Sequence, residues 1–275
     1  MMLCKFNKFF YTMKNLLLLS FFIIFSTSCS KDDESSSATN SNSNSSTNST
    51  STSNNLSVGA SANGLLSADK FTSMVVEIVY VEGFQPTTTA VNNFVTFLNN
   101  RTFKPNGITV QQRSIPSPNL STYTIQQIID IENANRTAFS TENQIAVWAY
   151  FSDGASSGNS GNSVVLGTAY KNTSFVIFEE TIHGLSDSTF EPERSDIEST
   201  VIQHEFGHIF GLTDLGSPLQ SQHEDQAHPK HCDVDTCLMF WQAETGSGIM
   251  GMVSGGNVPQ LDAQCIADLQ ANGGK

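Results

Sequence analysis

His-Glu-Phe-Gly-His-Ile-Phe-Gly, residues 204–211, is the stretch of this sequence that decides its fold and its chemistry. It lies in a segment, residues 202–212, whose pattern predicts a helix. Because positions four apart share a helix face, the imidazoles of His204 and His208 point toward one spot. Two imidazole nitrogens so placed are two ligands of a zinc site. Glu205 lies between them and is placed to take a proton from a water on the metal.

The first 55 residues have the composition of an export signal followed by a tether. Three lysines precede an apolar run over residues 16–25, and small residues and Cys29 follow it, which predicts a signal peptide over residues 1–28. Residues 29–55 open with an acidic cluster and then consist almost wholly of Ser, Thr and Asn, which predicts a disordered tether. Residues 56–275 are long enough to form one domain with a substantial core.

The periodicity of residues 56–275 is that of an α/β domain. Strand-like and helical segments alternate, which predicts a mixed, mostly parallel sheet with a hairpin-like edge near its end. A small C-terminal subdomain is expected beyond the motif helix. Strands are expected over residues 74–81, 107–113, 144–151, 164–170 and 174–178, and helices over residues 87–100, 125–134 and 202–212.

The charge balance excludes some partners. The chain has 26 acidic against 13 basic residues, a formal net charge of −13. Nucleic acid and anionic lipid surfaces attract basic proteins, so we expect neither as a partner. We expect a monomer.

The motif resembles that of the metzincin clan of zinc proteases. The clan's pattern is H-E-x-x-H-x-x-G-x-x-H/D, followed later by a methionine in a tight turn below the metal. His204, Glu205, His208 and Gly211 match this pattern, and Asp214 stands where the third ligand is usually found. The resemblance implies a metzincin-like fold with Zn²⁺ as cofactor.

A second stretch of sequence narrows the resemblance to one family within this clan. Residues 231–239, His-Cys-Asp-Val-Asp-Thr-Cys-Leu-Met, are similar to the H-C-x4-C-x-M string of archaemetzincins. In that family the histidine is the third zinc ligand and directly follows the Gly-x-x. The resemblance therefore implies that residues 213–230 contain an insertion, that His231 is a ligand, and that Met239 is the apolar floor of the site.

The third ligand is open on sequence grounds. Asp214 has the clan spacing, whereas His231 has the archaemetzincin context. Imidazole is the commoner third donor, and an inserted loop costs mainly closure entropy, so we favour His231. His223 and His228 are further alternatives. His183 lies outside these motifs and is expected to be a surface or structural histidine.

Three cysteines remain after the signal region. Archaemetzincins use the two cysteines that match Cys232 and Cys237, with a later C-x-x-C, as a second, structural zinc site. Here only Cys265 stands for that later pair. Three thiolates with Asp268 or a loop histidine could hold zinc. Export favours the alternative, a disulfide among the three.

The string around Cys29 resembles a bacterial lipoprotein cleavage box, although Ser and Thr replace its apolar positions. The acidic residues 30–34 look like the tether signal of surface lipoproteins in the Bacteroidetes group. The resemblance implies a chain lipidated at Cys29, anchored in the outer membrane and exposed at the bacterial surface. Simple secretion with an incidental cysteine is the alternative.

The expected function follows from these residues. We expect a zinc-dependent endo- or exopeptidase in which zinc-bound water attacks the peptide bond and Glu205 is the general base. The strand over residues 164–170 is the expected sheet edge, where a peptide could add as an extra strand. One alternative is a catalytically inactive, substrate-binding surface lipoprotein with a protease fold. Another is a surface anchor in which the motif is incidental and no metal is bound.

Overall fold

The structure, a computed structural model, describes residues 54–161 and 163–275. The predicted signal peptide over residues 1–28, the lipidation residue Cys29 and the tether as far as residue 53 lie outside the described residues. In the described part of the chain, no helix combines the length and apolar character needed to cross a membrane.

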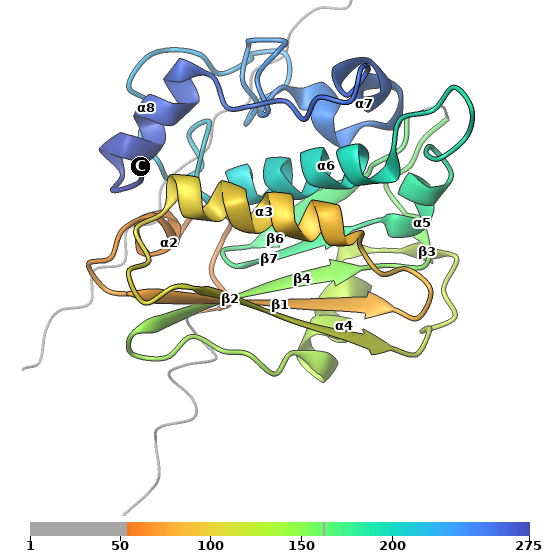
Figure 1. Cartoon of the computed structure of the whole chain (residues 1–275), viewed down its shortest axis with the longest axis horizontal. Helices are drawn as coiled ribbons and strands as arrows, with labels where there is room; N and C mark the ends of the chain where they lie inside the picture. The colour runs from red at the N-terminus through yellow and green to blue at the C-terminus, as the bar shows by residue number, and fades with distance from the viewer. Residues whose placement is uncertain (1–53, 162) are drawn as a thin grey trace, which may run out of the picture. The chain divides into compact units, whose positions relative to one another are not determined.

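Five strands form the main sheet, in the order β2-β1-β4-β7-β6 (Figure 1). The first four pair in parallel, and β6 runs antiparallel to β7 at one edge. The predicted α/β class, the mostly parallel sheet and its hairpin-like edge are therefore confirmed. The strands are β1 Ser73–Val81, β2 Ile108–Ile115, β4 Gln144–Phe151, β6 Gly167–Lys171 and β7 Ser174–Ile177.

Helices cover both faces of this sheet. In Figure 1, α3 (Thr88–Arg101) and α6 (Arg194–Ile209) lie on one face and α4 (Ile125–Asn135) lies on the other. Successive strand residues point to opposite faces, so a central strand must be apolar on both. In β1, Val76 belongs to the core under α3 and α6, and Val79 belongs to the core against α4.

Local capping explains where two helices begin. The Thr87 side chain accepts a hydrogen bond from the backbone N–H of Ala90 at the start of α3. Thr124 forms a capping box with Gln127 at the start of α4. Such caps satisfy N–H groups that have no partner within the helix. Both predicted helices agree with the structure to within a residue at each end.

The predicted start of the motif helix is wrong. Helix α6 begins at Arg194, eight residues before the predicted start at residue 202. Its first half buries polar side chains, among them Glu198, which accepts hydrogen bonds from the backbone N–H and the hydroxyl of Thr87. These buried polar residues hide the apolar periodicity that marks a helix in the sequence. The helix ends at Ile209, and Gly211 follows in a left-handed conformation with φ of 76°.

The chain after α6 forms the predicted small C-terminal subdomain. In Figure 1 it passes over α6 on the side away from the sheet. Its elements are η1 Trp241–Glu244, α7 Gly246–Met252 and α8 Ala263–Ala271. Short elements elsewhere, which the sequence did not predict, are α2 Ala62–Leu66, α5 Glu179–His183, and the paired strands β3 Thr122–Tyr123 and β5 Ala155–Ser156.

The subdomain also shortens the edge strand. Val165 forms an antiparallel bridge with Thr245, and the N–H of Leu166 donates to the carbonyl of Glu244 at 3.0 Å. These two residues therefore pair with the subdomain, and β6 begins at Gly167 instead of residue 164.

Candidate metal centre

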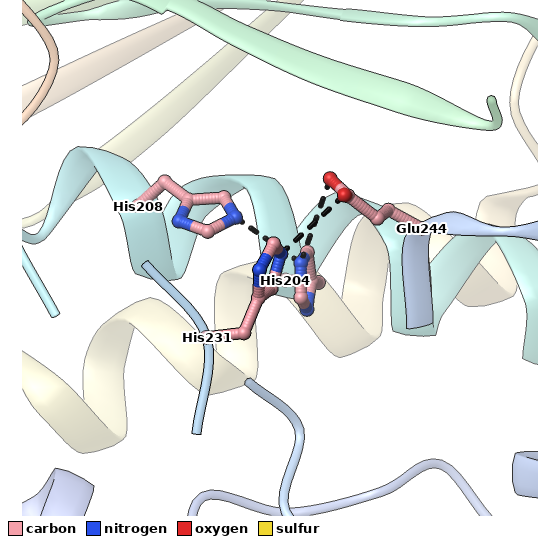
Figure 2. Close-up of side chains that lie close together, drawn as sticks. All are labelled: His204, His208, His231 and Glu244. Atoms are coloured by element: carbon pink, nitrogen blue, oxygen red, sulfur yellow. Dashed lines mark hydrogen bonds and ion pairs between the residues drawn. The ribbon is translucent and has the colours of Figure 1, made fainter. Parts of the chain in front are cut away.

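Three histidines converge between α6 and the chain that follows it. His204 and His208 lie on consecutive turns of α6, and their Nε2 atoms are 3.2 Å apart. His231 comes from the loop, and its ring centroid is 5.3 Å from that of His204 and 5.1 Å from that of His208 (Figure 2). Asp214, the other candidate for third ligand, is exposed and does not join this group.

The hydrogen bonds of the imidazoles leave their Nε2 atoms available to a metal. The Nδ1 atom of His204 lies 2.7 Å from the carbonyl oxygen of Leu238. A carbonyl only accepts, so Nδ1 carries the proton and Nε2 carries the lone pair. The Nδ1 atom of His231 is likewise 3.2 Å from the carbonyl oxygen of Pro229.

Burial keeps the two helix imidazoles neutral. It lowers the pKa of His204 to about 4 and that of His208 well below its usual range. Neutral imidazole is the form that binds zinc, and three such donors are a common catalytic zinc set. The residues present therefore fit a zinc ion.

Met239 packs against α6 at Gly207, between the two helix histidines. Its side chain is fully buried, and a Cβ placed on Gly207 would lie 2.2 Å from its sulfur. Only glycine at position 207 lets the methionine lie against the helix between His204 and His208. The preceding carbonyl, that of Leu238, is the one that orients His204. Met239 thus packs against α6 between its two histidines.

Glu205 faces the same centre from a fully buried position. Its Oε2 accepts a hydrogen bond from the backbone N–H of Ala169 at 2.7 Å, and its Oε1 has no hydrogen-bond partner among the described residues. A Cβ on Gly167 would lie 2.7 Å from Oε1, so glycine at that position makes room for the carboxylate. Burial first, and the nearby charge of Glu244 second, raise the pKa of Glu205 well above its usual range.

A pocket of about 200 Å³ opens onto this centre. It borders β6, the edge strand of the sheet. Its carboxylates come from Glu205 and from Glu244, the last residue of η1. Glu244 was not predicted as a site residue from the sequence, because it approaches the histidines only when η1 is folded. The lining residues are Val58, Thr168, Ala169, Glu205, His208, Leu215, Lys230, His231 and Glu244.

The three cysteines form a second cluster, together with His223 and Asp262. The Sγ atoms of Cys237 and Cys265 are 3.7 Å apart, and the Sγ atom of Cys232 is 3.5 Å from Nδ1 of His223. All three thiols are free, so the disulfide favoured on sequence grounds is not formed among the described residues. Asp268 contacts the other ring nitrogen of His223, and its Oδ2 lies 2.8 Å from Nε2.

The remaining histidines have structural partners outside both clusters. His228 stacks on Trp241 with ring centroids 4.1 Å apart and pairs with Asp225. His183 lies 3.2 Å from the buried carboxylate of Glu179. Neither histidine belongs to a group of metal-binding side chains among the described residues.

The comparisons with known proteins concern solved structures only, because no family model and no curated protein matches the chain. The chain is similar to archaemetzincin from Methanopyrus kandleri, with a TM-score of 0.48 and 16% identity over 73% of this chain and 96% of that one. It is similar to a zinc-dependent peptidase from Methanocorpusculum labreanum, with a TM-score of 0.43 and 12% identity over 70% of this chain and 99% of that one. For metalloproteinase-II from Bacteroides fragilis the TM-score is 0.40 and the identity 12%, over 75% of this chain and 54% of that one.

Proposed function

We propose that the chain is a zinc-dependent peptidase whose metal is held by His204, His208 and His231 and whose general base is Glu205. The observation that carries this proposal is the convergence of three imidazoles on one point beside a buried carboxylate. The pocket onto which they open borders a sheet edge. A structural zinc site needs neither a buried base nor an open pocket, whereas a peptidase needs both.

In the proposed reaction the metal and the protein have separate roles. Zinc, when bound, supplies a Lewis acid that polarises the scissile carbonyl and makes water more acidic. Glu205 must then be ionised to accept a proton, and a divalent cation beside it favours the ionised form. The N–H of Ala169 fixes its Oε2, which leaves Oε1 to take the proton and deliver it to the leaving amine.

The substrate that suits this arrangement is an extended peptide. Strand β6 is the edge of the sheet, and its residues Thr168 and Ala169 line the pocket. An extended chain can add to such an edge through main-chain hydrogen bonds. Its scissile carbonyl would then lie between β6 and the histidines, within reach of Glu205.

The identity of the third ligand gives the first test. The His231→Ala variant should lose the zinc of this centre, because two imidazoles alone hold zinc weakly. The Asp214→Ala variant should keep it, because that carboxylate is exposed and outside the group. Metal analysis of the two purified variants checks this. Zinc loss from Asp214→Ala, with retention in His231→Ala, would contradict the assignment.

We propose in addition that the cysteine cluster holds a second, structural zinc through Cys232, Cys237, Cys265 and Nδ1 of His223. In a tetrahedral site with Zn–S of ~2.3 Å, sulfur atoms lie ~3.75 Å apart. The separation of 3.7 Å between two of these sulfurs agrees with that value. Asp268 orients the histidine in the way that carboxylates orient zinc-binding imidazoles.

We also propose that the chain is a surface lipoprotein anchored through Cys29. The support is the sequence alone: an export signal, a cysteine after small residues, and an acidic start to the tether. The Cys29→Ser variant should then move from the membrane fraction to the soluble fraction, because it lacks the lipidated thiol. Fractionation and immunoblotting check this, and a wild-type chain already wholly in the soluble fraction would refute the anchor.

A further inference from the structure

Glu244 brings a second carboxylate to the three histidines. Figure 2 shows its side chain reaching from η1 toward His204 and His231. Its Oε1 is 3.4 Å from Nε2 of His231, and its Oε2 is 3.9 Å from Nε2 of His204. One ligand atom from each of these three residues and one from His208 all lie within 4.8 Å of one another.

Two of the distances between these atoms match those of a four-coordinate zinc shell. With metal–ligand distances of 2.0–2.1 Å, the corners of a tetrahedron are ~3.3–3.4 Å apart. The Nε2 atoms of His204 and His208 are 3.2 Å apart, and the contact between His231 and Glu244 is 3.4 Å. The distance between Nε2 of His204 and Oε2 of Glu244 is longer, at 3.9 Å, so the carboxylate of Glu244 lies near the corner that three histidines alone would leave open.

The contacts of Glu244 with His204 and His231 are unfavourable unless a cation lies between the side chains. The Nδ1 atoms of His204 and His231 face backbone carbonyls, so the Nε2 atoms that face Glu244 carry lone pairs. A carboxylate opposite a lone pair is repelled. Glu205 adds a second, fully buried carboxylate to the same pocket. A divalent cation between these groups would attract both the carboxylates and the imidazole lone pairs, and so remove the repulsion.

We propose that Glu244 is a fourth protein ligand of the catalytic zinc in the resting chain and yields its place to the substrate. This inference rests on the proposed function and adds to it a closed resting state. Structural zinc sites have four protein ligands, whereas catalytic sites keep one position open. Hydrolysis therefore requires the Glu244 side chain to swing away from the metal.

The surroundings of Glu244 suit such a movement. Its side chain is 30% exposed, whereas those of His204 and His231 are 0% and 11% exposed, so it is the most exposed of the three. Its backbone carbonyl accepts a hydrogen bond from Leu166, immediately before β6. A peptide that adds to β6 would therefore arrive beside Glu244, which places the displacing substrate next to the ligand that leaves.

The experiment compares the wild type with Glu244→Ala and Glu244→Asp, and Glu142→Ala serves as a charge-matched control on an exposed loop. Competition with a chromophoric chelator measures zinc affinity. Azide titration of the cobalt-substituted protein, followed in its visible spectrum, measures access to the fourth position. Removal of groups that only orient a ligand costs 10–100-fold in metal affinity, so loss of a ligand should weaken zinc binding at least ~10-fold.

The two measurements should move in opposite directions. Glu244→Ala should bind zinc more weakly and azide at least ~10-fold more tightly than the wild type, because azide no longer competes with the carboxylate. Glu244→Asp keeps the charge but shortens the reach, so it should also bind azide more tightly. Glu142→Ala should match the wild type in both measurements.

Several results would overturn the inference. One is unchanged zinc and azide affinity in Glu244→Ala. Another is a Glu244→Asp variant that behaves as the wild type, since charge alone would then explain the effect. A third is unchanged metal binding with a higher KM only for peptides with a free amino terminus, which would make Glu244 an amine-binding residue. Failure of the wild type itself to hold zinc at His204 and His208 would instead refute the proposed function.

Discussion

The Glu205→Gln variant should hydrolyse peptides about 10²–10⁴-fold more slowly than the wild type, the usual cost of losing a general base. It should keep its zinc, because Glu205 is not among the side chains that form the candidate metal centre. The amide is nearly isosteric, and its oxygen can still accept the hydrogen bond from Ala169. Initial rates on a peptide mixture, with metal analysis of the same samples, give both quantities.

Two outcomes would count against the assigned role of Glu205. If Glu205→Gln cleaves peptides at the wild-type rate, the base is another group. If the zinc-loaded wild type cleaves no peptide, and the Glu244→Ala variant cleaves none either, the chain is a binding protein with a protease fold. The second variant matters because it removes the ligand that we propose closes the resting site. Glu142→Gln, with the same change of charge on an exposed loop, should retain full activity.

The Cys265→Ala variant should hold one zinc per chain where the wild type holds two. A metal bound 1,000-fold above its dissociation constant stabilises the folded state by about 4 kcal/mol. In a domain of this size each kcal/mol shifts Tm by about 2–4 °C, so its loss should lower Tm by about 10 °C. Metal analysis and thermal unfolding of the variant check the two parts. Gln270→Ala, an exposed residue of the same helix, is the matched control.

A chelator separates the second zinc from the disulfide alternative. If Cys232, Cys237, Cys265 and His223 hold zinc, a strong chelator should lower the Tm of the His231→Ala variant, which lacks the catalytic zinc, and a non-chelating reductant should not. Sensitivity to the reductant together with resistance to the chelator would instead show that a disulfide links two of the cysteines. A wild-type chain that holds a single zinc would also contradict the second site.

Much of the fold was predictable because its central strands are apolar on both faces. β4 has the predicted bounds, Gln144–Phe151, since seven of its eight residues are buried and the run stands out in the sequence. The first half of α6 was not predictable, because buried polar residues such as Glu198 find partners only in the folded chain. The β3 and β5 pair is too short, at two residues each, to leave a periodic signal.

The site was predictable where its spacing is local. His204 and His208 share a helix face at any helix register, so their convergence follows from the sequence. The choice between Asp214 and His231 depends on the path of an inserted loop, which no local rule specifies. Glu244 approaches the histidines only because η1 pairs with Leu166 before the edge strand, a contact between distant parts of the chain. The proposed role of Glu244 therefore could not be predicted from the sequence.

Anomalous diffraction at the zinc absorption edge, from crystals of the zinc-loaded protein, tests the metal centre most directly. The predicted result is a peak ~2.0–2.1 Å from the Nε2 atoms of His204, His208 and His231, the distance typical of zinc–imidazole bonds. A peak bound by Asp214 in place of His231, or no peak near His204 and His208, would contradict the account.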